Sequence, residues 1–140
     1  MATTAGSTRT TTSVNQRVAL VVGVIFLLVG VLGWFVTGGH GFADRDGGSL
    51  LGFEVNPLHN IVHLLVGVVL IVGARGGLSA ARAANSAVGA VYLVVGIIGL
   101  FILDSSANIL ALNGADNGLH LVSGIVLLGT GLFADKAARR

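Results

Sequence analysis

Four side chains that can bind a metal ion occur in this chain as two pairs, and the members of each pair are four positions apart. His59 and His63 form the first pair, and Asp116 and His120 form the second. Residues at that spacing lie on one face of an α-helix, so each pair could chelate an ion. Imidazole nitrogen and carboxylate oxygen suit zinc or copper. The symmetric histidines His63 and His120 could instead ligate a haem iron.

The two pairs lie in two copies of one longer segment, residues 56–67 and 113–124. The copies share two asparagines, one histidine, one leucine and one glycine at a constant offset of 57. Each copy opens a long apolar run, and its amides and imidazoles form a paired polar cluster: Asn56, Asn60, His63, Asn113, Asn117 and His120. Lipid penalises such groups on a helix surface, so they must point into a helix bundle or a water-filled mouth. Hydrogen bonding between helices is therefore the alternative to metal binding, and the spacing alone favours it.

The amino-acid composition excludes an ordinary soluble domain. Apolar residues make up 54% of the 140 residues, charged residues make up only 10%, and the mean hydropathy is +0.91. These values indicate an integral membrane protein. Cysteine is absent, which excludes disulfides, thiolate metal sites and cysteine nucleophiles. The net charge is only +2 and the basic residues are scattered, so nucleic acid is not an expected partner.

Four apolar runs predict an all-α fold, an integral membrane four-helix bundle. The first run is uncharged over about 19 residues, which at 1.5 Å per residue span the hydrocarbon core of about 30 Å. The four predicted spans are residues 18–36, 57–74, 83–103 and 117–134. A cleaved signal peptide is the rival interpretation of the first span, but the run is long for one. The spans form one domain, residues 17–135. A disordered Thr/Ser-rich cytoplasmic tail, residues 1–16, precedes it, and a basic cytoplasmic tail, residues 136–140, follows it.

The first and third spans also match each other, at an offset of 66 that pairs Phe26 with Tyr92. Together with the offset of 57, this match predicts two helical hairpins related as a parallel repeat. Glycine lets helix backbones approach closely in a membrane. We therefore expect the repeated glycines at helix–helix contacts: Gly23, Gly30, Gly33, Gly67, Gly89, Gly96, Gly99 and Gly124.

The basic residues predict the orientation of the chain in the membrane. All the arginines and lysines except Arg45 lie on one side of the predicted spans. Cytoplasmic loops carry the excess of basic residues, so both termini should be cytoplasmic and the polar cluster should face outward. The expected partners are the lipid bilayer and either another membrane protein or further copies of this chain.

Helix capping accounts for part of the polar cluster without any function. Asn56 is a good N-cap that is followed by Pro57 at the first helical position, and Asn113 with Asp116 resembles a capping box. Capping does not explain the members of the cluster that lie further along each helix: Asn60, His63, Asn117 and His120.

The segment that opens the second span, with Asn56, His59, Asn60 and His63, resembles that of a family of small four-helix bacterial membrane proteins known only as a domain of unknown function. The resemblance covers about residues 14–134. It implies a four-span protein of the bacterial inner membrane, and it carries no established activity.

Signatures of enzymes are missing from the sequence. There is no phosphate loop, nucleotide-binding fingerprint, zinc-protease helix or serine nucleophile elbow. We therefore predict an accessory or interaction protein of the membrane rather than an enzyme. The alternative is a metal- or haem-binding subunit associated with redox or transport machinery. Zinc, copper or haem would be its cofactor, and the candidate metal ligands are His59, His63, Asp116 and His120.

Overall fold

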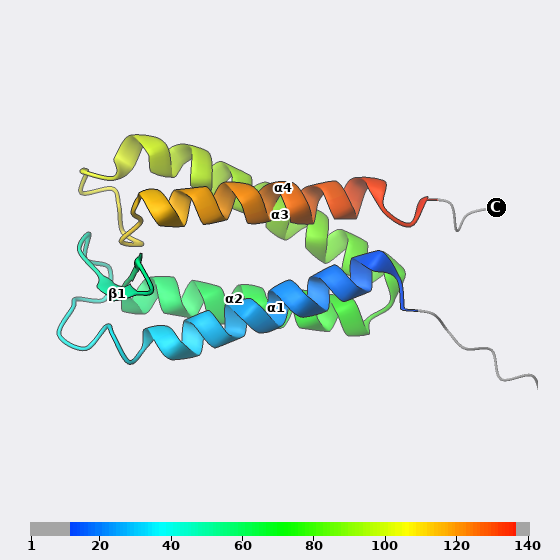
Figure 1. The fold of residues 1–140 in the computed structure, drawn as a ribbon, viewed down its shortest axis with the longest axis horizontal. Coiled ribbons are helices and arrows are strands. Elements are labelled where there is room, and N and C mark those ends of the chain that lie inside the picture. Colours follow the sequence, from blue (N-terminus) through cyan, green and yellow to red (C-terminus); the bar gives the residue numbers. More distant parts are fainter. Residues whose placement is uncertain (1–11, 137–140) are drawn as a thin grey trace, which may run out of the picture.

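The computed structural model describes residues 12–136, which fold into four α-helices and one short β-hairpin. The helices are α1 (Val14–Gly33), α2 (Pro57–Arg75), α3 (Leu78–Ile102) and α4 (Gly114–Phe133), and the antiparallel strands β1 (Gly48–Leu50) and β2 (Phe53–Val55) lie between α1 and α2. The helices run alongside one another, and the hairpin lies at one end of them (Figure 1). The prediction of an all-α bundle is confirmed. The outer parts of the two predicted tails, residues 1–11 and 137–140, lie outside the described residues.

Three helices begin earlier than the predicted spans, and for α4, which begins at Gly114 rather than at residue 117, the cap at Asn113 indicates the observed start. α1 begins at Val14, inside the predicted tail, because Ser13 and Gln16 form a capping box in which each side chain accepts from the other residue's backbone N–H. α3 begins at Leu78 rather than at residue 83, directly after Gly77, whose φ is +94°. The charge of Arg82 limits the apolar run, but it does not limit the helix.

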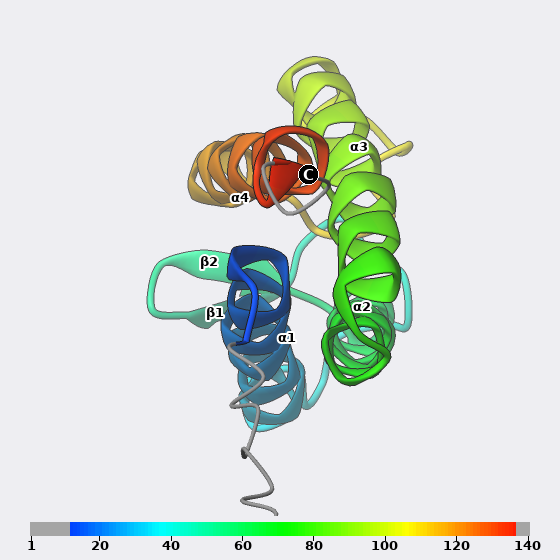
Figure 2. The ribbon, with the colours of Figure 1, turned by 90° about the vertical axis from the view of Figure 1, so that its right-hand side faces the viewer.

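The helices pack mainly as two pairs, α1 with α2 and α3 with α4. Figure 2 looks along the bundle and shows these two pairs one above the other, with the start of α3 lying beside α2. At one end of the bundle α1 and α3 end while α2 and α4 begin, and this end is here called the histidine end (Figure 1). The β-hairpin and the connection between α3 and α4 lie at this end.

Glycines make the closest helix contacts, and they do so at corresponding positions in the two pairs. A Cβ atom on Gly30 would lie 2.8 Å from Cγ of Leu64, and one on Gly96 would lie 2.9 Å from Cγ of Leu121. Both members of the second contact follow those of the first by the offsets of 66 and 57. The other predicted packing glycines have equally close neighbours across the helix pair: Gly23, Gly33, Gly67, Gly89, Gly99 and Gly124. Backbones approach at all of these positions because no side chain intervenes.

Apolar side chains cover the outside of the helices, and much of the interior at the histidine end is polar. Exposed apolar residues occur on all four helices, among them Val21, Leu28, Val72, Val94, Val122 and Ile125. An apolar core, with Leu70 and Leu127 fully buried, also lies in the interior. Within the described part of the chain, α1, α2 and α3 are the helices long and apolar enough to cross a membrane. This arrangement indicates a membrane protein.

Candidate functional site

Two N-caps place the candidate residues within the first turns of α2 and α4. The Asn56 side chain accepts from the His59 backbone N–H at 2.8 Å, and Pro57 occupies the first helical turn. At α4, Asn113 and Asp116 form a complete capping box. Both predicted caps are therefore confirmed. They start the two helices at the same end of the bundle, so His63 and His120 lie at similar depths, and His59 lies one turn closer to the helix start.

Three histidines meet inside the bundle at the histidine end. His59 and His63 come from successive turns of α2, and His120 comes from α4. One ring nitrogen of each lies within 4.8 Å of one ring nitrogen of each of the others. Their exposed fractions are 1%, 2% and 3%. The helix pairs thus bring together three donors that are far apart in the sequence.

Most of the imidazole nitrogens lack a hydrogen-bond partner. Among the described residues, no hydrogen bond of good geometry forms at either ring nitrogen of His59 or His63, or at Nδ1 of His120. The backbone oxygens of Glu54 and Leu110 lie near the His59 ring. A buried polar group without a partner costs on the order of 1–3 kcal/mol. Hydrogen bonding between helices is the interpretation favoured by spacing alone, and no such bond forms at these five ring nitrogens among the described residues.

Two aromatic rings at corresponding positions of α1 and α3 hold the imidazoles in place. The ring of Phe26 stacks on His63 with centroids 5.4 Å apart, and it also stacks on Tyr92 at 5.1 Å. Tyr92 in turn meets His120 edge to face at 5.0 Å. The sequence shows that these two aromatics correspond, but it does not show that they line the histidine cluster. The Tyr92 hydroxyl is buried, and no described residue bonds to it.

Asp116, the fourth predicted ligand, has its carboxylate directed elsewhere. Its Oδ2 accepts from the backbone N–H of Asn113 at 3.0 Å and from that of Glu54 in β2 at 3.1 Å. The described cluster of potential metal ligands contains the three histidines without this carboxylate. Asp116 therefore joins the start of α4 to the β-hairpin.

The deeper asparagines pack against glycines. The Asn60 side chain lies directly against Gly33, and Asn117 lies in the same way against Gly99. Nδ2 of Asn60 donates to Oγ1 of Thr37 at 3.4 Å, whereas Asn117 has no partner among the described side chains and backbone. These two amides therefore repeat a packing contact, and they do not belong to the group of three histidines.

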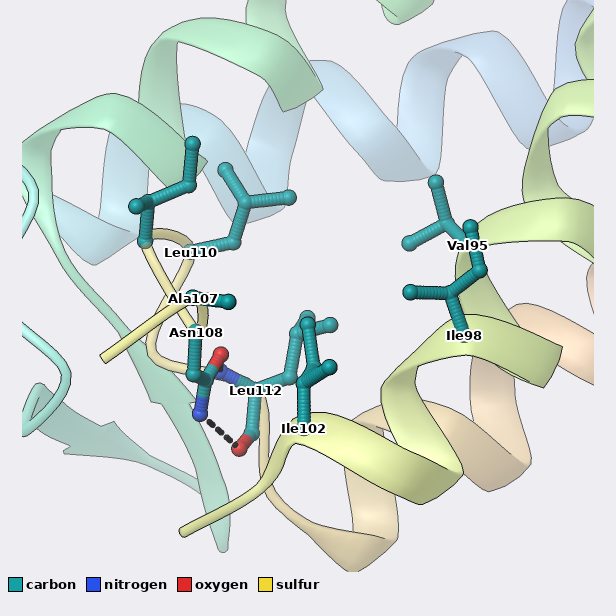
Figure 3. Close-up of a pocket in the computed structure, with 8 residues that line it drawn as sticks. Val95, Ile98, Ile102, Ala107, Asn108, Leu110 and Leu112 are labelled. Atoms are coloured by element: carbon teal, nitrogen blue, oxygen red, sulfur yellow. Dashed lines mark hydrogen bonds between the residues drawn. The ribbon is translucent and has the colours of Figure 1, made fainter. Parts of the chain in front are cut away.

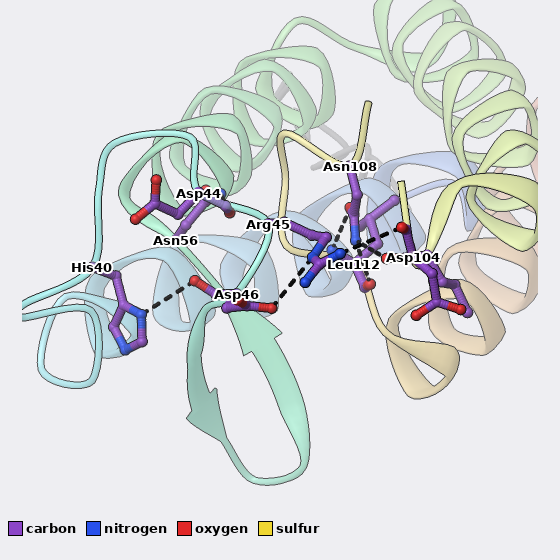
Figure 4. Close-up of polar contacts among 9 residues, drawn as sticks. His40, Asp44, Arg45, Asp46, Asn56, Asp104, Asn108 and Leu112 are labelled. Atoms are coloured by element: carbon purple, nitrogen blue, oxygen red, sulfur yellow. Dashed lines mark hydrogen bonds and ion pairs between the residues drawn. The ribbon is translucent and has the colours of Figure 1, made fainter. Parts of the chain in front are cut away.

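The capping asparagines also tie down the loops at the histidine end. Nδ2 of Asn56 donates to the backbone oxygens of Asp44 and Ile109, each at 2.8 Å. Figure 4 shows Asn56 beside Asp44, and it shows Arg45 reaching from one long connection to the backbone oxygen of Asp104 in the other. Arg45 also pairs with Asp46 at 3.5 Å on the surface, where such a pair stabilises little.

The cavities at this end differ in character, and those described are small. A polar cavity of about 280 Å³ lies near Arg45, Glu54 and Asp104, and an apolar cavity of about 160 Å³ lies between the end of α3 and the loop that follows it. In the second cavity, shown in Figure 3, Asn108 crosses the loop by donating to the Leu112 oxygen at 2.9 Å. The cavity that borders His63 measures about 80 Å³. A haem needs several times that volume, since ligand pockets begin at about 300 Å³. The arrangement therefore does not fit a porphyrin between His63 and His120.

A second polar group, which the sequence analysis did not predict, lies at the end of the bundle opposite the histidine end. Asp135 follows α4 and accepts from the backbone N–H and the side chain of Asn15, both at 2.9 Å. Asn85 of α3 donates to the side-chain and backbone oxygens of Asn15 at 3.0 Å. Asn85, which lies inside the third predicted span, was the available signal, because lipid penalises an unpaired amide. Asn15 lies in the predicted tail and gave no such signal.

Comparisons with known proteins give a family and no activity. No curated protein and no solved structure matched the chain. One family model matched, and it covers residues 16–133, which include all four helices but for the first two residues of α1. The chain therefore belongs to the family described as a domain of unknown function (DUF4383).

Proposed function

We propose that this chain is a multi-pass membrane protein that binds one zinc or copper ion at His59, His63 and His120. In this proposal it serves the membrane as an accessory protein, and the ion is its cofactor. The observation that carries the proposal is the convergence of three buried imidazoles, in which one nitrogen of each ring lies within 4.8 Å of the others. Five of the six ring nitrogens form no hydrogen bond in the described chain.

Small movements would turn this cluster into a ligand set. In a tetrahedral site with bonds of about 2.0–2.1 Å, ligand nitrogens are about 3.3 Å apart. The ligand nitrogens would therefore move closer together by up to roughly 1.5 Å, which is within the reach of side-chain rotation on fixed helices. Three neutral imidazoles suit zinc and copper better than calcium or magnesium, which take oxygen ligands.

The position of the aromatic rings supports the same conclusion. Phe26 and Tyr92 lie against His63 and His120 and leave the imidazoles little freedom to turn toward other partners. Rings held in this way lose less freedom when an ion binds, which favours binding.

Metal content is the direct test. The purified protein should hold about one equivalent of zinc or copper by elemental analysis, and a chelator should lower its melting temperature. His63→Gln should reduce the affinity by more than the roughly 100-fold that loss of a supporting residue costs at metal sites. His40→Gln is the matched control, because His40 lies in the loop before the hairpin and faces the Asp46 backbone oxygen at 3.2 Å.

The pair His63→Gln and His63→Leu separates metal binding from polar packing. Gln keeps a donor and an acceptor, but neither substitute replaces an imidazole ligand. Under the proposal both variants lose the ion and melt at similar temperatures, with or without chelator. A Gln variant that melts close to the parent, together with a parent that holds no metal, would establish polar packing instead.

The orientation proposed here has four spans and both termini in the cytoplasm of a bacterium. Support comes from Arg17, Arg75, Arg82 and Lys136, all at the end opposite the histidine end, whereas Arg45 lies at the histidine end. α4 has 20 residues, and its exposed side chains include Ile125 and Phe133. The two hairpins would represent a duplicated unit.

Cysteine labelling tests the orientation in a chain that has no native cysteine. Ser49→Cys in the β-hairpin should react with an impermeant thiol reagent on intact cells, and Ser79→Cys at the start of α3 should not. Both serines are exposed. Labelling of position 79 without position 49 would reverse the proposed orientation.

A further inference from the structure

The turn of the β-hairpin contains a leucine in an unusual conformation and environment. Leu51 has φ of +55° and is followed by Gly52 at +92°, and 91% of the Leu51 surface is exposed. Turns of this kind favour Asn-Gly, because the polar side chain of Asn can hydrogen-bond locally at positive φ, whereas an apolar side chain gains no such bond there. Neither the turn geometry nor contact with water accounts for a leucine at this position.

The hairpin is held in a fixed direction by the start of α4. Nδ2 of Asn113 donates to the Gly52 backbone oxygen at 2.9 Å, and the Asp116 carboxylate accepts from the Glu54 N–H at 3.1 Å. At the other end of β1, the backbone of Gly48 lies directly against Val36, where a Cβ atom would collide with the backbone oxygen. The β-hairpin is therefore fixed in position, and the exposure of Leu51 does not result from a loosely held loop.

The hairpin lies beside the helix ends and points sideways. Figure 1 places it next to the first turns of α2, and Figure 2 shows it projecting laterally beyond α1 and α4. The small cavity beneath it is lined by Leu50, Leu51 and Phe53 of the hairpin together with Val29 of α1 and Leu119 of α4, and its lining is almost entirely apolar. The tip thus continues the apolar lateral surface of the helices.

We infer that the hairpin tip, residues 50–53, is embedded in the lipid at the histidine end of the bundle. Acyl chains contact Leu51 and fill the cavity between the tip, α1 and α4. The two faces of the hairpin differ as this inference requires, because Leu50 and Phe53 line the apolar cavity whereas Glu54 lines the polar one. Ser49 pairs with Glu54, and Glu54 lines the polar cavity beside Arg45, so that part of the hairpin faces water. The same cavity also borders His63, and the inference rests on the hairpin turn and the exposure of Leu51 rather than on a bound metal.

Spin labelling can measure the environment of the tip. Leu51→Cys and the matched control Ser49→Cys would each carry a nitroxide in an otherwise cysteine-free chain, reconstituted into phosphatidylcholine vesicles containing phosphatidylglycerol. Oxygen concentrates in lipid, whereas a nickel chelate stays in water. We expect oxygen to relax the label at position 51 several-fold more effectively than the chelate does, and the reverse at position 49.

Two results would overturn the inference. Equal access of the nickel chelate to positions 51 and 49 would place the tip in water. An immobilised label at position 51 that neither reagent reaches would place the tip against another protein or a second copy of this chain. A Leu51→Trp variant in a Trp34→Phe background gives a second reading that needs no label, because brominated lipids should quench its fluorescence if the tip is embedded.

Discussion

The helix pairs α1–α2 and α3–α4 use the same contacts for packing but differ in the side chains that surround the histidines. Gly33 faces Asn60 in the first pair, and Gly99 faces Asn117 in the second. In contrast, Phe26 corresponds to Tyr92, and His59 corresponds to Asp116. Positions where backbones approach accept only glycine, whereas positions facing the central cluster accept different side chains.

The difference between His59 and Asp116 gives these two corresponding positions different roles. His59 joins His63 and His120 in the cluster, whereas Asp116 caps α4 and binds the backbone of the hairpin. A symmetric pair of histidines would have given four imidazoles and left Glu54 without this anchor. The first helix pair thus supplies two of the three candidate ligands, and the second helix pair anchors the β-hairpin at the histidine end.

The largest expected effect comes from the glycine contacts that the two pairs share. A Cβ atom on Gly89 would collide with the backbone nitrogen of Leu128, which cannot move away, whereas one on Gly23 would overlap less, with Cγ1 of Ile71 at 2.9 Å and the Gly67 backbone oxygen at 3.0 Å. Gly89→Ala should therefore cost about 2–3 kcal/mol in unfolding free energy, and Gly23→Ala should cost about 1 kcal/mol. Denaturation in detergent measures both.

Gly129→Ala is the control for these substitutions, because nothing lies within 4 Å of a Cβ atom at that position. Its unfolding free energy should stay within about 1 kcal/mol of the parent, with the change favouring the folded state because alanine is the better helix former. Equal costs at positions 89 and 129 would mean that α3 and α4 do not approach as closely as the structure shows.

The next effect concerns the anchor that only the second pair has. Asp116→Ala removes the acceptor for two backbone N–H groups and should cost about 1–2 kcal/mol, as loss of a helix cap does. Hydrogen exchange at the Glu54 amide should become faster in this variant. Asp104→Ala is the control, since Asp104 is exposed, and its effect should stay within about 0.5 kcal/mol. Unchanged exchange at Glu54 would show that the hairpin has another anchor.

A smaller effect, opposite in sign, is expected from making the aromatic pair identical. Tyr92→Phe removes a buried hydroxyl that has no partner among the described residues. The variant should be as stable as the parent or more stable by up to about 1 kcal/mol, because no hydrogen bond is lost. Thermal unfolding without metal gives the comparison. A loss of more than 1 kcal/mol would reveal a partner for the hydroxyl.

The smallest effect is a pH dependence at the opposite end of the bundle. Hydrogen bonds from the Asn15 backbone and side chain lower the pKa of Asp135. A carboxylate with a lowered folded-state pKa stabilises the fold above its unfolded pKa of about 4, and this contribution is lost as the pH falls through the folded-state pKa. The melting temperature of Asp135→Asn should therefore fall slightly below that of the parent at pH 6 and approach it near pH 3. A difference that is the same at both pH values would mean that the charge of Asp135 plays no part.

Much of the fold is readable from the sequence because it depends on neighbours along the chain. Apolar runs predict the helices, and Asn56, Pro57 and Asn113 predict where α2 and α4 begin. The repeated glycines indicate where helices approach, since few other residues permit that distance. The helix starts at Val14 and Leu78 were misjudged, because apolarity marks the membrane and does not mark the first hydrogen-bonded turn.

What the sequence by itself determined is which side chains share a helix face, as for His59 and His63 on α2. Only the tertiary structure decided that His120 joins them while Asp116 turns toward the β-hairpin, because the separation between α2 and α4 depends on how both helix pairs pack. The hairpin was itself absent from the predictions. Its strands are three residues each, too short for an alternating pattern to appear, and they are stabilised by contacts with the start of α4 that lie about 60 positions away in the chain.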